Sequence, residues 1–153
     1  MRIFIFLHIA TVMTAVAFSI GPTFLLRRVA DSGDVPAMRR SFAMAAPLVR
    51  IIPAVFGLGA LLGIVAIFTN DYNPFEPWLL IAYVMFVLAA VVGARLTTPW
   101  FNRVLKASAE SPDSGPSGEL AAAVGDPLMW WVEWFDRGIV LAFLLDMVIK
   151  PFG

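Results

Sequence analysis

The sequence predicts an all-α membrane protein, a polytopic bundle of four antiparallel transmembrane helices. Apolar residues make up 60% of the 153 residues and charged residues 14%, whereas soluble domains have about 45–50% and about 25%. A soluble domain of this length exposes too much of its surface to hide so many apolar side chains. The apolar residues also gather into stretches near the ~20 residues that cross a bilayer. These stretches are residues 3–26, 48–68, 78–99 and 128–149, within one transmembrane domain of residues 1–153.

Polar segments rich in turn-forming residues separate the four predicted spans. They are residues 27–41, 69–77 and 102–127. The last is the predicted cytoplasmic loop, and its residues 108–119 have the composition of a flexible acidic linker.

The distribution of Lys and Arg predicts the orientation of the bundle. Of the 11 basic residues, nine lie in or beside the segments 27–41 and 102–127, and only Arg2 and Lys150 lie at the other side. Cytoplasmic loops carry the excess of Lys and Arg, so both termini are expected outside the cytoplasm. Interfacial aromatic residues should mark the boundaries, with Trp78 and Tyr83 outside and Trp100, Trp130 and Trp131 inside.

Small residues give the second span a smooth face that includes Gly59 and Gly63. Such faces let helix backbones approach closely in a membrane. The face is expected to pack either within the chain or against a second copy.

Five ionisable residues fall in the cytoplasmic half of the predicted spans and form an inner charge cluster. Glu133 and Arg137 have the favourable i,i+4 order, and Asp136 is expected to meet Arg50 or Arg95 across a helix interface. Intramembrane charges are candidate functional groups. The cluster is therefore either a set of ion pairs that fixes helix register or a site for an anion, a lipid head group or a proton. Its members are Arg50, Arg95, Glu133, Asp136 and Arg137.

His8 is the single histidine and lies near the outer end of the first span. Asp146 lies at a similar depth on the fourth span, so the two side chains are expected to meet if those helices are neighbours. One imidazole cannot form a bis-histidine haem site within one chain. His8 is therefore interpreted either as an interhelical hydrogen-bonding residue or as a haem ligand or proton-handling group, with Asp146 as its hydrogen-bond partner.

The composition excludes several classes of function. The absence of cysteine removes disulfides and thiolate metal sites. A net charge of zero argues against nucleic-acid binding as the main function. No catalytic motif is recognised, so neither catalytic residues nor a metal site are predicted.

Three short motifs carry a resemblance to a known family. They are Leu7-His8 early in the first span, Gly21-Pro22 near its end, and the closing Met147-Val148-Ile149-Lys150-Pro151. In these the chain resembles small bacterial integral membrane proteins of domain of unknown function 2269. Their layout is similar to that of HemJ-type protoporphyrinogen oxidases and of the membrane domain of CopD copper-resistance proteins. The resemblance implies a bacterial inner (plasma) membrane and a haem-binding role for His8.

These observations predict a non-enzymatic accessory or assembly subunit in the lipid bilayer, as a homodimer or within a larger membrane complex. Two alternatives remain open. One is a haem-associated membrane redox protein that uses His8. The other is a small transporter that uses the inner charge cluster.

Overall fold

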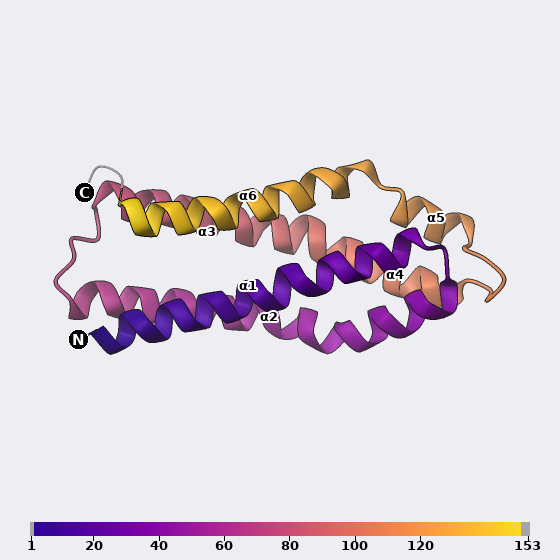
Figure 1. Cartoon of the computed structure of the whole chain (residues 1–153), viewed down its shortest axis with the longest axis horizontal. Helices are drawn as coiled ribbons and strands as arrows, with labels where there is room; N and C mark the ends of the chain where they lie inside the picture. The colour runs from indigo at the N-terminus through magenta and orange to yellow at the C-terminus, as the bar shows by residue number, and fades with distance from the viewer. Residues whose placement is uncertain (1, 151–153) are drawn as a thin grey trace.

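The computed structural model describes residues 2–150, which are helical apart from short connecting segments (Figure 1). The all-α prediction is confirmed for this part of the chain. Met1 and residues 151–153 lie outside it, and with them Pro151 of the closing motif. The elements are α1 (Arg2–Asp31), α2 (Val35–Thr69), α3 (Pro77–Val92), the π-helical segment η1 (Gly93–Thr97), α4 (Thr98–Glu110), α5 (Gly118–Val124) and α6 (Pro127–Ile149).

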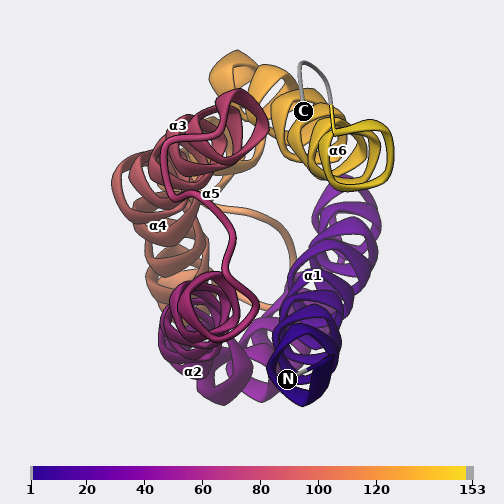
Figure 2. The same cartoon turned by 90° about the vertical axis from the view of Figure 1, so that its left-hand side faces the viewer.

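The long helices run antiparallel in two pairs, with α1 along α2 and α6 along α3 (Figures 1 and 2). The start of α1, the connection 70–76 and the end of α6 lie at one end of the molecule (Figure 1). We call the half that contains them the open end. The other half, which contains α4, α5 and the turn between α1 and α2, is the packed end.

A tight turn joins α1 to α2 at the packed end. Gly33 has φ +72, a conformation in which glycine has no steric penalty. Asp34 then caps α2, since its carboxylate accepts a hydrogen bond of 2.9 Å from the N–H of Ala37. Pro36 follows in the first helical turn, where its missing N–H has no partner to lose.

One continuous helix runs from Pro77 to Glu110 through η1. Pro99 has no N–H, and its ring would clash with the carbonyl four residues earlier in a regular α-helix. The π-helical turn relieves this conflict, and the N–H of Thr98 bonds to the carbonyl of Gly93, five residues back. The helix therefore passes the proline without ending.

The packed end has a hydrophobic core like that of a soluble protein. Phe42 is fully buried and stacks on Phe101 with ring centroids 5.3 Å apart. Trp100 is 2% exposed and donates an indole hydrogen bond of 2.9 Å to the carbonyl of Ala123. The prediction of Trp100 as an interfacial anchor is therefore wrong, because the chain folds α5 over it. The buried core residues are Leu26, Ala30, Val35, Met38, Phe42, Ala45, Trp100, Phe101, Val104, Ala107, Leu120, Ala123, Met129 and Val132.

Much of this core comes from segments predicted as polar connections. Residues 27–41 contain the end of α1 and the start of α2, and residues 102–127 contain most of α4 and all of α5. The segment 111–117 is also held in place. The guanidinium of Arg39 donates to the carbonyls of Ser108 and Ser111 at 3.1 and 2.8 Å and to Asp113 at 2.9 Å. The flexible-linker prediction missed this long-range contact.

Three helical stretches are long and apolar enough to cross a membrane: Arg2–Asp31, Val35–Thr69 and Pro77–Glu110. α6 is a fourth long helix, but its sequence carries Glu133, Asp136, Arg137 and Asp146. Charged residues lower the transfer free energy gained by a spanning helix. With these four charges, α6 is not among the three stretches that meet the requirements for crossing a membrane.

Candidate functional site

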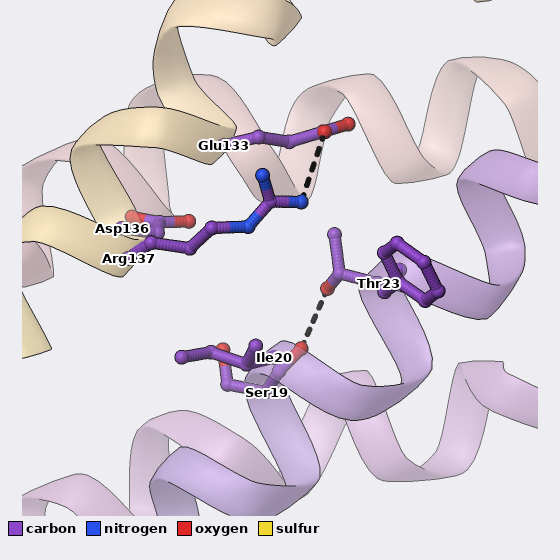
Figure 3. A pocket seen from close by; sticks show the side chains of 7 residues that line it. Ser19, Ile20, Thr23, Glu133, Asp136 and Arg137 are labelled. Carbon is purple, nitrogen blue, oxygen red and sulfur yellow. Dashed lines mark hydrogen bonds and ion pairs between the residues drawn. The ribbon is translucent and has the colours of Figure 1, made fainter.

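Glu133 is the centre of the charge cluster at the packed end (Figure 3). Its carboxylate pairs with Arg137, one turn further along α6, at 3.6 Å. It also meets Arg27 of α1 at 3.9 Å, and Arg27 pairs with Asp31 at 3.2 Å. The predicted pair of Glu133 and Arg137 is thus present. Arg27 adds a link from α6 to α1 that the sequence did not reveal, because Arg27 was placed in a connecting segment and α1 instead continues to Asp31.

The predicted contacts of Asp136 with Arg50 or Arg95 do not form. Within residues 2–150, no Arg or Lys nitrogen lies within 4.0 Å of the Asp136 carboxylate. Arg50 on α2 and Arg95 in η1 are both exposed. Their helices present these side chains to the outside, so the five predicted residues do not form a single cluster.

The space beside Asp136 is small. Ser19 and Thr23 of α1 line it together with Glu133, Asp136 and Arg137 (Figure 3). The hydroxyl of Thr23 donates back to the carbonyl of Ser19 at 2.6 Å. The cavity volume is about 20 Å³, and a water molecule needs roughly 10–15 Å³ by such a measure. In this arrangement the cluster joins α1 to α6 and has no room for an organic anion.

The open end contains a much larger cavity, of about 360 Å³, between the two helix pairs. Looking along the bundle from this end, α1 and α2 lie apart from α3 and α6 (Figure 2). Small-molecule sites commonly have volumes of about 300–1,000 Å³ and mostly apolar walls. The lining residues are mainly apolar or aromatic: Ile5, His8, Ile9, Ala60, Gly63, Ile64, Ala66, Ile67, Tyr72, Trp78, Leu79, Ala82, Tyr83, Phe86, Val87, Met147 and Lys150.

His8 lies in the wall of this cavity and is held against α2. Its Nδ1 lies 2.7 Å from the carbonyl oxygen of Gly59. A carbonyl oxygen only accepts, so Nδ1 carries the proton and donates it. Gly63 leaves room for the His8 ring, because a Cβ at this position would lie 2.9 Å from two atoms of the imidazole. Gly59 likewise lies close to Val12. At these two glycines, the small-residue face of α2 packs within the chain.

Asp146 does not meet His8. It is 5% exposed, and neither carboxylate oxygen has a hydrogen-bond partner among the described residues. Asp146 is also absent from the cavity lining. The expected contact required the first and fourth helices to be neighbours along this half, whereas α1 packs mainly on α2 and α6 on α3.

Lys150 and two aromatic residues lie together in the cavity wall, a group that sequence reasoning missed. The Lys150 ammonium lies 5.0 Å from the ring centroid of Tyr72 and 5.1 Å from that of Trp78. These distances are typical of cation–π contacts. The Trp78 indole N–H donates to the carboxylate of Glu76. The only sequence signal was the clustering of aromatic residues between positions 72 and 83.

In the part of the chain that the structure describes, no three His, Asp or Glu side chains gather as metal ligands. Comparisons of the chain with protein-family models, curated proteins and solved structures find no match. The arrangement of the two sites is therefore the main basis for a functional proposal.

Proposed function

We propose that the protein is a four-span membrane protein, with α6 as the fourth span, in a bacterial inner membrane. The exposed surface supports this, because large apolar side chains face outward along the helices where a bilayer would cover them. Examples are Phe6 at 65% exposure, Leu61 at 62% and Val148 at 81%. The charges of α6 support it as well. Glu133 is paired toward α1 and Asp146 is buried, so neither faces lipid directly.

We further propose that the packed end is cytoplasmic and that both termini lie outside. Arg27, Arg39 and Arg103 belong to the packed end, whereas Arg2 and Lys150 are the basic residues of the open end. Because the chain has no cysteine, single cysteines report orientation cleanly. Asn73→Cys should react with an impermeant thiol reagent added outside intact cells, and Ser32→Cys and Ser114→Cys should react only after permeabilisation. Labelling of Ser114→Cys from outside would show the opposite orientation, with the packed end outside.

For the function itself, we propose a non-enzymatic accessory subunit whose open end binds a largely apolar molecule from the bilayer. The observation that carries this proposal is the cavity of about 360 Å³, lined by apolar and aromatic side chains with His8 in its wall. An apolar wall with a few placed polar groups is the usual form of a small-molecule site. The charge cluster, by contrast, is closed by its own ion pairs.

A cavity-filling variant tests this proposal. Ala82 lines the cavity, whereas Ala90, on the same helix, is exposed and does not. Solvent extracts of the purified protein should contain a bound apolar compound by mass spectrometry. Ala82→Phe should reduce its amount at least tenfold, and the matched control Ala90→Phe should leave it unchanged. Equal amounts in all three preparations would contradict binding in the cavity.

Haem is a second candidate ligand, favoured by the orientation of His8. With its proton on Nδ1, a neutral imidazole keeps a lone pair on Nε2 for iron, and the hydrogen bond from Nδ1 to a carbonyl is the usual support of a ligating histidine. His8 would hold the iron through Nε2, and Lys150, another residue of the cavity wall, would be the cation that meets a carboxylate substituent. Bound haem would supply electron transfer.

An absorption spectrum decides for or against haem. The protein purified from cells with ample haem should show a Soret band that His8→Ala abolishes. His8→Gln, which keeps a polar side chain, should also lack the band. A colourless preparation of the unaltered chain would rule out haem as the ligand and would not affect the proposal of another apolar ligand.

A further inference from the structure

The polar groups in the cavity wall differ in whether they already have partners. The Trp78 indole N–H donates to Glu76, and the Tyr83 hydroxyl donates to the carbonyl of Pro74 at 3.3 Å. The Lys150 ammonium lies over two aromatic rings. Two groups have no hydrogen-bond partner within residues 2–150, the Tyr72 hydroxyl and His8 Nε2. The hydroxyl can rotate to donate or to accept, whereas Nε2 can only accept, because Nδ1 carries the proton that is bonded to Gly59.

The free nitrogen of His8 is an acceptor. Because Nδ1 donates to a carbonyl, the neutral ring carries its lone pair on Nε2. An acceptor in a largely apolar wall is unfavourable until a donor reaches it. A ligand that brings a hydrogen-bond donor to this point therefore binds more tightly than one of the same shape without a donor.

The rest of the wall favours an aromatic and uncharged ligand. Tyr72, Trp78, Tyr83 and Phe86 place four aromatic rings around the cavity, and aromatic pairs gain from edge-to-face or offset contacts. Lys150 is the one charged side chain among the lining residues, and its ammonium already has two rings as partners. An ion would lose its hydration in this largely apolar wall, so an uncharged ligand is favoured.

We propose that the cavity recognises a membrane-soluble aromatic alcohol, whose phenol-type O–H donates a hydrogen bond to His8 Nε2. This inference rests on the proposed function and names its ligand class. The apolar part of the molecule lies among the side chains of α2 and α3, and the hydroxyl reaches α1. His8 acts here as a binding residue through one hydrogen bond, and Gly59 and Gly63 hold its ring in the required orientation.

Two probes that differ only in the donor test the proposal. 4-Octylphenol and its methyl ether, 4-octylanisole, have nearly the same shape, but the ether has no O–H. Binding is measured by quenching of tryptophan fluorescence, since Trp78 lines the cavity. A net gain of one hydrogen bond predicts roughly tenfold tighter binding of the phenol. Equal binding of the two probes to the unaltered chain would overturn the inference, and this comparison does not depend on any variant folding.

Variants of His8 then assign the preference to its side chain. His8→Phe keeps a ring but removes the acceptor, so the two probes should bind equally. His8→Gln keeps a carbonyl acceptor and should retain part of the preference. An undiminished preference for the phenol in a folded His8→Phe protein would show that another group receives the hydroxyl and would overturn the assignment.

The same measurements separate failure of this inference from failure of the proposed function. If Ala82→Phe weakens both probes while they bind equally to the unaltered chain, the cavity binds apolar molecules and only the hydroxyl inference fails. If neither probe binds above the level of Ala82→Phe, both proposals fail. Ala90→Phe serves as the control and should bind both probes as the unaltered chain does.

Discussion

The packed and open ends of this molecule are built from the same helices but differ in how those helices meet. At the packed end, large side chains such as Phe42, Met38 and Trp100 are less than 3% exposed and fill the space between elements. At the open end, the described core is a small cluster of Ile67, Trp78 and Leu79, with Tyr72 against it. Beside this cluster lies the cavity of about 360 Å³.

The contrast separates the half of this helical bundle that stabilises the fold from the half that leaves space for a ligand. Filling space with apolar side chains stabilises a fold, whereas a site for a ligand requires that space be left. The packed end therefore holds the bundle together, and α1 and α2 can stand away from α3 and α6 at the open end without loss of the fold.

The largest expected effect compares two phenylalanines, one from each end. Phe42 is fully buried in the packed core, and Phe86 lines the cavity and is only partly buried. Phe42→Ala should lower the free energy of unfolding by about 3–5 kcal/mol, through lost burial and a new void. Phe86→Ala enlarges an existing cavity and should have less than half that effect. Denaturant unfolding in detergent measures both, and equal losses would contradict the contrast between the ends.

The charge cluster provides the second comparison, between neighbouring acids of α6. Glu133→Gln leaves Arg27 and Arg137 without their shared carboxylate and should destabilise the protein by about 2 kcal/mol. Asp136→Asn removes a carboxylate with no ion pair in the described residues and should change stability by less than half as much. Thermal unfolding of the two variants in the same detergent tests this order. A greater loss of stability from Asp136→Asn would show that Asp136, and not Glu133, makes the stronger contacts in the cluster.

The smallest expected effect concerns two glycines of α2. A Cβ at Gly63 would lie 2.9 Å from the His8 ring, whereas nothing lies within 4 Å of one at Gly57. Gly63→Ala should displace the imidazole from the Gly59 carbonyl and destabilise the protein by about 1–2 kcal/mol. Gly57→Ala should be neutral or stabilise by up to about 1 kcal/mol, because alanine favours helix. Unfolding free energies and the nitrogen chemical shifts of His8 report both effects, and unchanged His8 shifts in Gly63→Ala would argue against this packing.

The sequence predicted the four long helices, one ion pair of the charge cluster and one residue of the cavity wall. The apolar runs located the four long helices, and the i,i+4 spacing located the pair of Glu133 and Arg137, because both signals are local in the chain. It also singled out His8, which lies in the cavity wall. It missed the helical parts of residues 27–41 and 102–127, whose apolar residues are mixed with Arg, Asp and Ser and so do not form a continuous run.

The amino-acid sequence by itself determined that this chain forms long apolar helices and where its charges fall along them. Tertiary structure alone decided which helices pair, and so it placed His8 against Gly59, Arg27 beside Glu133, and Lys150 over Tyr72 and Trp78. The physical reason is that helices with apolar residues on every side lack the single apolar stripe that reveals the buried face of a soluble helix. Their rotation and pairing are set by close packing at small residues and by a few polar contacts between distant segments.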